Sequence, residues 1–222
     1  GINAPFSGKH IQKFNMHGYA APRLDKVRVG FIGTGNRGTA NMAQFARVEG
    51  VEIKALCDIY PERTEKAVKQ LSGSHKPETY SGSDDIWKKL CERDDIDVVV
   101  ISTPWAWHAR QSVYAMENGK HAAVEVPAAV TLEECWQLVE TSERTRKHCM
   151  MLSNSAYGDF NILTLNMARQ GFFGEIIHGE GAYIHDIAGT LFHRGNTEER
   201  WRLKENIKRN GMEQLQNIEK IL

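Results

Sequence analysis

The chain has 222 residues, with 28 basic and 28 acidic side chains and a formal net charge of zero. This balance argues against a nucleic-acid-binding protein and against a protein that binds anionic membrane surfaces, because both usually carry a basic patch. No apolar run approaches the roughly 18 residues that a membrane-spanning helix needs. The length fits one large domain, or one domain and part of another.

The cysteines follow no pattern that binds metal. Cys57, Cys91, Cys135 and Cys149 form no Cys-x-x-Cys motif and have no metal-ligand spacing. Three of them lie in apolar or helical runs, which predicts buried free thiols and no metal site. Free thiols fit a reducing compartment without requiring one. The chain shows no signal peptide, so the cytoplasm is the default expectation, but it begins at Gly1 without Met, which leaves open a removed targeting segment.

The first elements are typical of a dinucleotide-binding unit. Residues 1–24 are polar and aperiodic, which predicts an N-terminal arm. An apolar run at 27–32 is followed by a Gly-x-Gly-x-x-Gly turn, a helical run, a second apolar run at 51–56 and Asp58. In such units the first glycine permits the tight turn, the second admits the pyrophosphate, and the third lets helix and strand pack closely.

The turn contains Gly33, Gly35 and Gly38, and the helix behind it offers free N–H groups to phosphates. Asp58 follows the first glycine by about 25 residues, close to the spacing at which an acid binds the ribose hydroxyls. An acid there favours NAD over NADP because it repels a 2′-phosphate. Arg37, inside the turn, could soften that preference. The predicted cofactor is NAD.

The elements that follow alternate between helix and strand. Asp84 is expected to cap a helix, Gly119 to end one, and Thr131 and Glu134 to form a capping box. The sequence predicts helices at 60–71, 84–91, 108–118 and 131–147, and strands at 78–80, 97–101, 122–124 and 149–152. This alternation predicts an α/β fold with a doubly wound parallel Rossmann sheet over residues 25–154.

The pattern changes in the last third of the chain. Residues 160–170 are predicted to form a helix that ends at Gly171, residues 175–183 alternate like a strand, and a helix-prone tail begins near Arg200. One strand and two helices cannot build a sheet of their own. Residues 155–222 are therefore interpreted as an incomplete α+β substrate domain. Its uncovered apolar face leads us to expect a homo-oligomer.

Ligands of doubly wound sheets bind at the carboxyl ends of the strands, and the residues there resemble a known family. The Gly33–Gly38 turn, Ser102-Thr103-Pro104 with His108, and a Glu-x-Pro tripeptide after the fifth strand are similar to the glucose-fructose oxidoreductase / inositol dehydrogenase (Gfo/Idh/MocA) family. Most of that family carries Glu-Lys-Pro, and the lysine assists proton transfer at the hydroxyl being oxidised. Here Val126 stands in its place, which argues against ordinary sugar-dehydrogenase chemistry.

With this valine, the chain resembles glycoside hydrolase family 109, the NAD-dependent α-N-acetylgalactosaminidases, over about residues 25–211. The motifs that carry the resemblance are Glu125-Val126-Pro127-Ala128, Trp105-Ala106-Trp107-His108, Asn154, Tyr157-Gly158, Tyr183-Ile184-His185-Asp186 and Trp201-Arg202-Leu203. The implied reaction is redox-neutral: carbon 3 of the sugar is oxidised by hydride transfer to NAD, carbon 2 loses a proton, the aglycone leaves carbon 1, water adds, and the hydride returns.

The motif and the resemblance together assign roles to individual residues. Tyr183 and Arg202 are expected to contact the sugar, and Glu125, Tyr157 and His185 are the catalytic candidates. The expected cofactor-binding residues are Gly33, Gly35, Asn36, Arg37, Gly38, Asp58, Thr103, Trp105, Trp107, His108, Glu125, Val126 and Asn154.

Simpler interpretations stay open for several of these residues. Trp105 and Trp107 are candidates for ordinary packing, and His108 for a cap on the following helix. Tyr183 fits a surface strand, and Arg202 fits an ion pair with a glutamate four residues earlier. Glu125 is harder to explain in this way, because an isolated buried carboxylate is costly.

A second departure affects the expected activity. In the family, an Arg-Asn-Gly near residues 209–211 precedes a Tyr-Pro-Thr-His stretch that supplies sugar contacts and a catalytic histidine. Residues 214–217 here read Gln-Leu-Gln-Asn, and the chain stops at Leu222. We therefore expect an incomplete active site. The alternatives are an NAD-dependent sugar or cyclitol dehydrogenase and a non-catalytic NAD-binding remnant or sensor. The resemblance also leaves export to the periplasm open.

Overall fold

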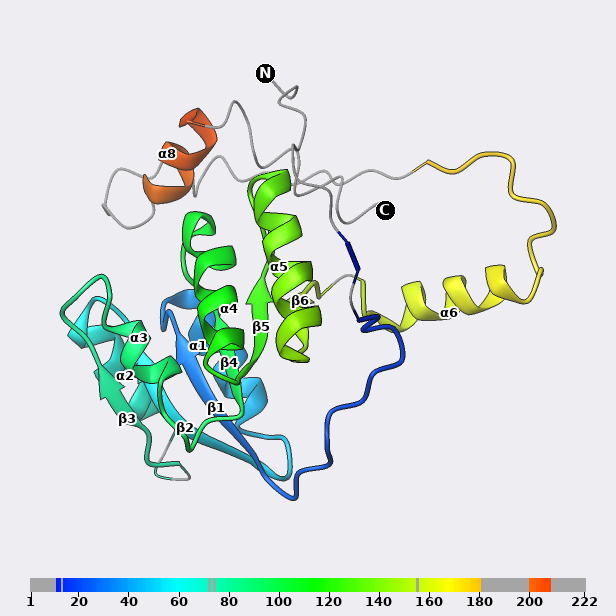
Figure 1. The fold of residues 1–222 in the computed structure, drawn as a ribbon. Helices are drawn as coiled ribbons and strands as arrows, with labels where there is room; N and C mark the ends of the chain where they lie inside the picture. Colours follow the sequence, from blue (N-terminus) through cyan, green and yellow to red (C-terminus); the bar gives the residue numbers. More distant parts are fainter. Residues whose placement is uncertain are drawn as a thin grey trace. The chain divides into compact units, whose positions relative to one another are not determined.

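A computed structural model describes residues 11–12, 14–71, 73, 75–154, 156–180 and 200–208. The chain divides into two compact units, residues 1–151 and 152–222. The first unit is built on a six-stranded sheet, with α4 and α5 in front of it and α1 behind it in the view of Figure 1. The helices of this unit are α1 (Asn36–Phe45), α2 (Pro61–Gln70), α3 (Trp87–Cys91), η1 (Trp105–Trp107), α4 (His108–Glu117) and α5 (Leu132–Thr145).

The strand order is β3-β2-β1-β4-β5-β6, which confirms the predicted doubly wound Rossmann sheet. The strands are β1 (Val27–Ile32), β2 (Val51–Cys57), β3 (Glu78–Tyr80), β4 (Val98–Ile101), β5 (His121–Glu125) and β6 (Cys149–Leu152). β1 pairs in parallel with both β2 and β4, so the strand order reverses on either side of it. Val29, Phe31 and Ile32 are buried, because a central parallel strand is covered by helices on both faces.

The predicted helix ends in the first unit are largely correct. The hydroxyl of Thr131 accepts the N–H of Glu134 at 3.2 Å, as in a capping box, and the carboxylate of Glu134 accepts the N–H of Val130 at 2.7 Å, one residue before the N-cap. Gly119 ends α4 with a φ of +80°. α5 stops at Thr145, two residues before its predicted end.

One predicted helix start is wrong. α3 begins at Trp87 and not at Asp84, and no side chain caps it. The chain first makes a tight turn, in which the N–H of Ile86 donates to the carbonyl of Ser83 at 3.2 Å. The carboxylate of Asp85 pairs with Lys88 at 3.0 Å. The polar residues before the helix therefore build a turn, and Asp84 stays exposed.

The four cysteines are free, but they are not all buried. Cys57 and Cys91 are buried and Cys149 is half-buried, whereas Cys135 is exposed on α5. Burial raises the pKa of the thiols of Cys57 and Cys91 to about 12. Cys135 is exposed because it lies in the first turn of an amphipathic helix, on the side that faces solvent.

The second unit contains α6 (Asp159–Arg169) and α8 (Arg200–Lys208) among its described residues. The predicted strand at 175–183 is wrong over its described part, because residues 175–180 have no regular structure. These residues are exposed, and no strand follows β6 in the described part of this unit. An alternating sequence forms a strand only where a neighbour pairs its N–H and C=O groups.

Candidate functional site

The glycine turn brings the start of α1 into close contact with the end of β1. Gly33 adopts a φ of +88°, and its N–H donates to the carbonyl of Cys57 at 2.8 Å. A Cβ on Gly33 would lie 2.7 Å from the carbonyl oxygen of Ser102, and a Cβ on Gly38 would lie 1.8 Å from the carbonyl oxygen of Gly33. Both contacts are too short for any side chain, so the geometry requires glycine at these two positions.

The N-terminus of α1 has free hydrogen-bond donors. Its N-cap is Gly35, which has no side chain to accept a hydrogen bond, and no acidic residue lies in the first turn. The first N–H groups of a helix have no partner within the helix, and with the helix dipole they attract anions. A phosphate group fits this position well. Gly35 would allow a phosphate to come close, because Arg63 is the only side chain of the described residues within 4 Å of an added Cβ.

Asp58 lies at the end of β2 and is tied to the glycine turn. It is only 5% exposed, and its carboxylate accepts the N–H of Thr34 at 2.8 Å and the N–H of Tyr60 at 3.1 Å. Arg63, on the first turn of α2, places a guanidinium nitrogen 3.7 Å from this carboxylate and stacks 4.8 Å above the ring of Tyr60. The acid therefore links the two elements that would flank the ribose.

Arg37 lies near a second acid of the site. Its guanidinium lies 3.7 Å from the carboxylate of Glu125, at the end of β5, and its side chain is 59% exposed. That Arg37 could soften the preference set by Asp58 stays a prediction. The cation beside Asp58 is Arg63. Sequence analysis missed Arg63 because only the packing of α2 against the end of β2 brings it to the acid.

Glu125 is held by a residue that sequence analysis also missed. Its Oε1 accepts a hydrogen bond from the side-chain amide of Asn41 on α1 at 2.8 Å, and this amide also lies 3.4 Å from the hydroxyl of Ser102. The side chain of Glu125 is 16% exposed, so the carboxylate is partly accessible. The available signal was spacing alone: Asn41 follows Gly38 by one helical turn and Arg37 by four residues.

His108 ties two loops together and does not cap α4. The ring is 1% exposed, with Nδ1 2.6 Å from the carbonyl of Pro127 and Nε2 2.7 Å from the carbonyl of Thr103. Burial lowers the pKa of His108, and the two carbonyls oppose that shift only in part. The hydroxyl of Thr103 donates to the side-chain oxygen of Gln111 at 2.7 Å. These contacts fix the loops that follow β4 and β5.

The two tryptophans near this loop differ in exposure. Trp105 is 2% exposed and belongs to the packed interior. Trp107 is half-buried, packs against the core beneath the sheet, and carries the guanidinium of Arg110 5.3 Å above its ring. Asn36 and Val126 lie in the first unit as well, at the start of α1 and just after β5. The first unit thus holds every predicted cofactor residue except Asn154.

The remaining predicted residues belong to the second unit. Asn154 and Tyr157 are exposed. Arg202 lies in α8, but its side chain is outside the described residues, as are Tyr183 and His185. Of the three predicted catalytic residues, Glu125 contacts Asn41, Tyr157 is exposed, and His185 lies outside the described residues.

The fold and this geometry define a class of protein. A glycine turn, a helix N-terminus with free donors and a buried acid after the second strand meet at the switch point of a doubly wound sheet, as in Rossmann domains that bind NAD or NADP. Residues 27–153 match the oxidoreductase family with an NAD-binding Rossmann fold, and the chain belongs to this family. Residues 157–215 match the C-terminal domain of glycosyl hydrolase 109.

Curated relatives carry glycosidase names. The chain is 54% identical over 192 residues to a glycosyl hydrolase family 109 protein from Porphyromonas gingivalis, covering 86% of this chain and 40% of that protein. It is 47% identical over 209 residues to an alpha-N-acetylgalactosaminidase from Shewanella oneidensis, covering 93% of this chain and 44% of that protein. The chain therefore spans less than half the length of these relatives.

Solved structures share the fold. A scyllo-inositol dehydrogenase from Lactobacillus casei, solved with NAD(H) and scyllo-inositol, has a TM-score of 0.61 at 20% identity, covering 68% of this chain and 43% of that one. No helix in the part of the chain that the structure describes could cross a bilayer. Within the same residues, no group of three or more His, Cys, Asp or Glu side chains could hold a metal ion.

Proposed function

We propose that the chain binds NAD at the Gly33–Gly38 turn and forms the cofactor-binding part of a glycosidase that acts on α-N-acetylgalactosaminides. The observation that carries the proposal is the likeness to an alpha-N-acetylgalactosaminidase, which extends over 93% of this chain and so includes both units. The turn also fits the cofactor, because two glycines leave no room for side chains and the helix N-terminus behind them keeps its donors for a phosphate.

The preference for NAD over NADP rests on Asp58. Its buried carboxylate lies beside the glycine turn, where the ribose of a bound dinucleotide would approach. A 2′-phosphate would bring further negative charge against this acid. Arg63, 3.7 Å from Asp58, offsets part of that repulsion. We therefore expect NAD to bind more tightly than NADP, but we do not expect NADP to be excluded.

The proposed chemistry depends on what replaces the usual lysine. Bound NAD supplies a hydride acceptor for carbon 3 of the sugar. Val126 cannot transfer a proton, so the protons must move through other side chains. Glu125 is the proposed group in the first unit, with Oε1 held by α1. Tyr157 and His185 are proposed for proton transfer and Tyr183 and Arg202 for sugar contacts in the second unit. Asn36, Arg37, Thr103, Trp105, Trp107, His108, Val126 and Asn154 remain proposed cofactor residues.

The test follows hydrolysis and cofactor reduction in one experiment. The purified chain is incubated with NAD and a chromogenic α-N-acetylgalactosaminide, and both aglycone release and the nicotinamide absorbance are recorded. Hydrolysis without net NADH supports the proposal, and uptake of solvent deuterium at carbon 2 of the product would add to that support. If the chain turns over, Glu125→Ala should abolish turnover, whereas the control Glu65→Ala, at an exposed glutamate on α2, should not.

Other outcomes would favour the alternatives. Accumulation of NADH with a sugar or cyclitol would contradict the glycosidase proposal and indicate a dehydrogenase. NAD binding without either reaction is the result that the expected incomplete active site predicts, and a non-catalytic binding protein would give the same result. Binding and turnover are therefore measured separately, since the chain covers 44% of the relative from Shewanella oneidensis.

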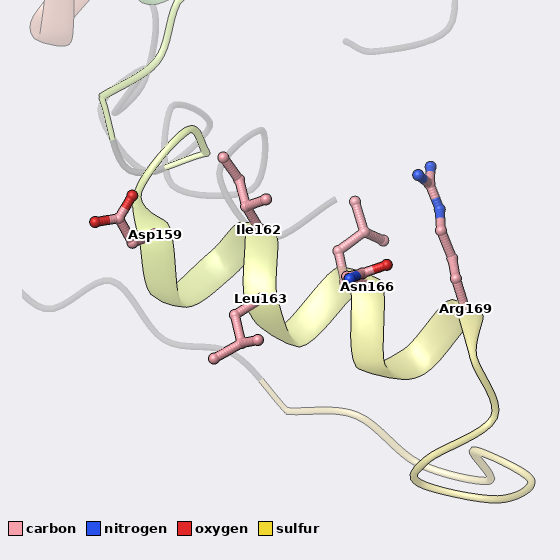
Figure 2. A pocket seen from close by; sticks show the side chains of 6 residues that line it. Asp159, Ile162, Leu163, Asn166 and Arg169 are labelled. Carbon is pink, nitrogen blue, oxygen red and sulfur yellow. The ribbon is translucent and has the colours of Figure 1, made fainter.

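The expected homo-oligomer also remains a proposal. α6 has no buried residue, and Phe160, Ile162, Leu163 and Leu165 are each more than half exposed. Among the described residues, a hollow of about 410 Å³ is lined by side chains of α6, and Figure 2 shows Ile162 and Leu163 pointing to opposite sides of the helix. Exposed apolar side chains of this kind favour association. Light scattering on the purified chain tests it, and a monomer at all concentrations would contradict it.

A further inference from the structure

The amide of Asn41 joins three elements at the carboxyl edge of the sheet. Its Nδ2 donates to Oε1 of Glu125 at 2.8 Å and lies 3.4 Å from the hydroxyl oxygen of Ser102. An ionised carboxylate can only accept hydrogen bonds, so the NH₂ side of the amide must face Glu125. Asn41 on α1 is therefore the donor, and the acceptors are Glu125 at the end of β5 and Ser102 just after β4.

Gly38 places Asn41 where it can make this contact. A Cβ on Gly38 would lie 3.5 Å from the Cβ of Ser102, an ordinary van der Waals distance, so this face of α1 lies against the residue that follows β4. Asn41 lies three residues after Gly38 and four after Arg37, and residues at these spacings share one face of a helix. The face that packs on the glycine turn is thus also the face that meets Glu125.

Asn41 and Arg37 contact the same carboxylate oxygen in different ways. Asn41 is half-buried and makes a hydrogen bond of ordinary length. Arg37 is 59% exposed, and its Nε lies 3.7 Å from Oε1, beyond hydrogen-bond distance. Surface ion pairs of this kind contribute little. Asn41 is therefore the residue that holds the carboxylate, and Arg37 can turn toward a phosphate without releasing it.

The second oxygen of Glu125 remains available. Both contacts described above use Oε1, and Oε2 has no hydrogen-bond partner within the described part of the chain. We propose that Asn41 is a positioning residue: it fixes the carboxylate of Glu125 through Oε1, so that Oε2 can accept a hydrogen bond from the bound dinucleotide. This inference rests on the proposed function, because it takes Glu125 as part of the dinucleotide site.

A double-mutant cycle on dinucleotide affinity tests the inference. The dissociation constant of NADH is measured for the wild type, Asn41→Leu, Glu125→Ala and the double variant. Removing a hydrogen bond to a charged group should weaken NADH binding about tenfold in the wild-type background and less than about twofold when Glu125 is already alanine. A role limited to the stability of the fold would cost the same in both backgrounds.

A matched control separates the amide from the helix. Gln44→Leu exchanges an exposed amide on the same helix for the same apolar side chain and should leave the affinity unchanged. Thermal unfolding of each variant confirms that the proteins compared are folded. Asn41→Asp should bind NADH more weakly than Asn41→Leu, because it sets one carboxylate against another.

Each result decides between the two proposals. Equal penalties for Asn41→Leu in both backgrounds would overturn the Asn41 inference and leave the proposed function intact. NADH binding that Glu125→Ala does not change would remove Glu125 from the site, and the inference with it. A wild-type chain that binds neither NAD nor NADH would contradict the proposed function itself.

Discussion

The two units differ in how their side chains are partnered. In the first unit Phe31, Met42 and Trp105 are almost fully buried, and the acid at the end of β2 accepts hydrogen bonds from two backbone N–H groups. In the second unit α6 buries no residue, and Phe160 is 78% exposed. Packing in the first unit therefore restricts what each proposed site residue can contact, whereas the roles proposed for the second unit rest on sequence similarity.

The largest expected effect comes from the glycine turn. Gly38→Ala would place a Cβ 1.8 Å from the carbonyl oxygen of Gly33, so α1 must move and the phosphate site is lost. We expect NAD affinity to fall by more than about a hundredfold, as titration calorimetry would show. The control is Gly179→Ala in the second unit, where an added Cβ meets no atom of the described residues within 4 Å. An unchanged affinity in Gly38→Ala would contradict the site.

A pair of phenylalanines compares the packing of the two units. Phe31 is 0% exposed in β1 and packs edge-on against Phe45 at 5.6 Å. Phe31→Ala should lower the free energy of unfolding by about 3–5 kcal/mol, measured by urea denaturation. Phe160→Ala should cost less than about 0.5 kcal/mol, since a surface substitution removes little packing. Similar losses for both variants would show that α6 is covered in solution.

Replacing Asp58, at the end of β2, should weaken NAD binding less than Gly38→Ala does. Asp58→Ala removes the acceptor of two backbone N–H groups and the proposed ribose contact. We expect the NAD dissociation constant to rise more than about tenfold, in line with one or two hydrogen bonds to a charged group. Asp84→Ala, at an exposed acid before α3, is the matched control. If Asp58→Ala bound NAD as tightly as the wild type, the ribose assignment would be refuted.

The smallest predicted effect is a dependence of the free energy of unfolding on pH, caused by His121 at the start of β5. Nδ1 of His121 accepts the N–H of His148 at 2.9 Å, so this nitrogen carries no proton. Burial lowers the pKa of His121, nearby Lys147 and His148 lower it further, and Asp97 opposes them. As the pH falls, His121 therefore takes up its proton first in the unfolded chain, whose pKa is about 6.5. The contribution of His121 to the free energy of unfolding is complete above that pH. It is lost as the pH falls through the lower pKa of the folded state.

The variant His121→Gln tests this dependence, because an amide oxygen can accept the same N–H without titrating. The loss of stability between neutral and mildly acidic pH, measured by urea denaturation, should be smaller in this variant than in the wild type. His178→Gln, at an exposed histidine of the second unit, should leave the loss unchanged. A steeper loss in His121→Gln would contradict the assigned direction of the shift.

The sequence predicted the parts of the molecule that depend on local pattern. The apolar run of β1, the glycine turn and the capping box of Thr131 and Glu134 are each defined within a few residues, and the structure shows all of them. Asn41 was missed because its contact joins α1 to the end of β5, 84 residues along the chain, and Arg63 was missed because its contact with Asp58 depends on how α2 packs against the end of β2. No local spacing identifies such a contact without the helix orientation.

The errors have the same origin. The alternation at 175–183 predicted a strand, but a strand needs a paired neighbour, and its described part has none. Asp84 matched the composition of a helix cap, yet the turn at Ser83 satisfies the backbone before α3 begins. Sequence patterns of this kind state what a segment can form, and tertiary contacts decide what it does form.

The most direct test of the central claim is the identity of the dinucleotide that the purified chain holds. Protein is denatured by heat, the released nucleotide is identified by mass spectrometry, and its amount per chain is measured; chains purified without nucleotide are titrated with NAD and NADP. The account predicts NAD or NADH, bound near one per chain or with clearly higher affinity than NADP. Release of NADP, or no binding of either nucleotide on titration, would contradict it.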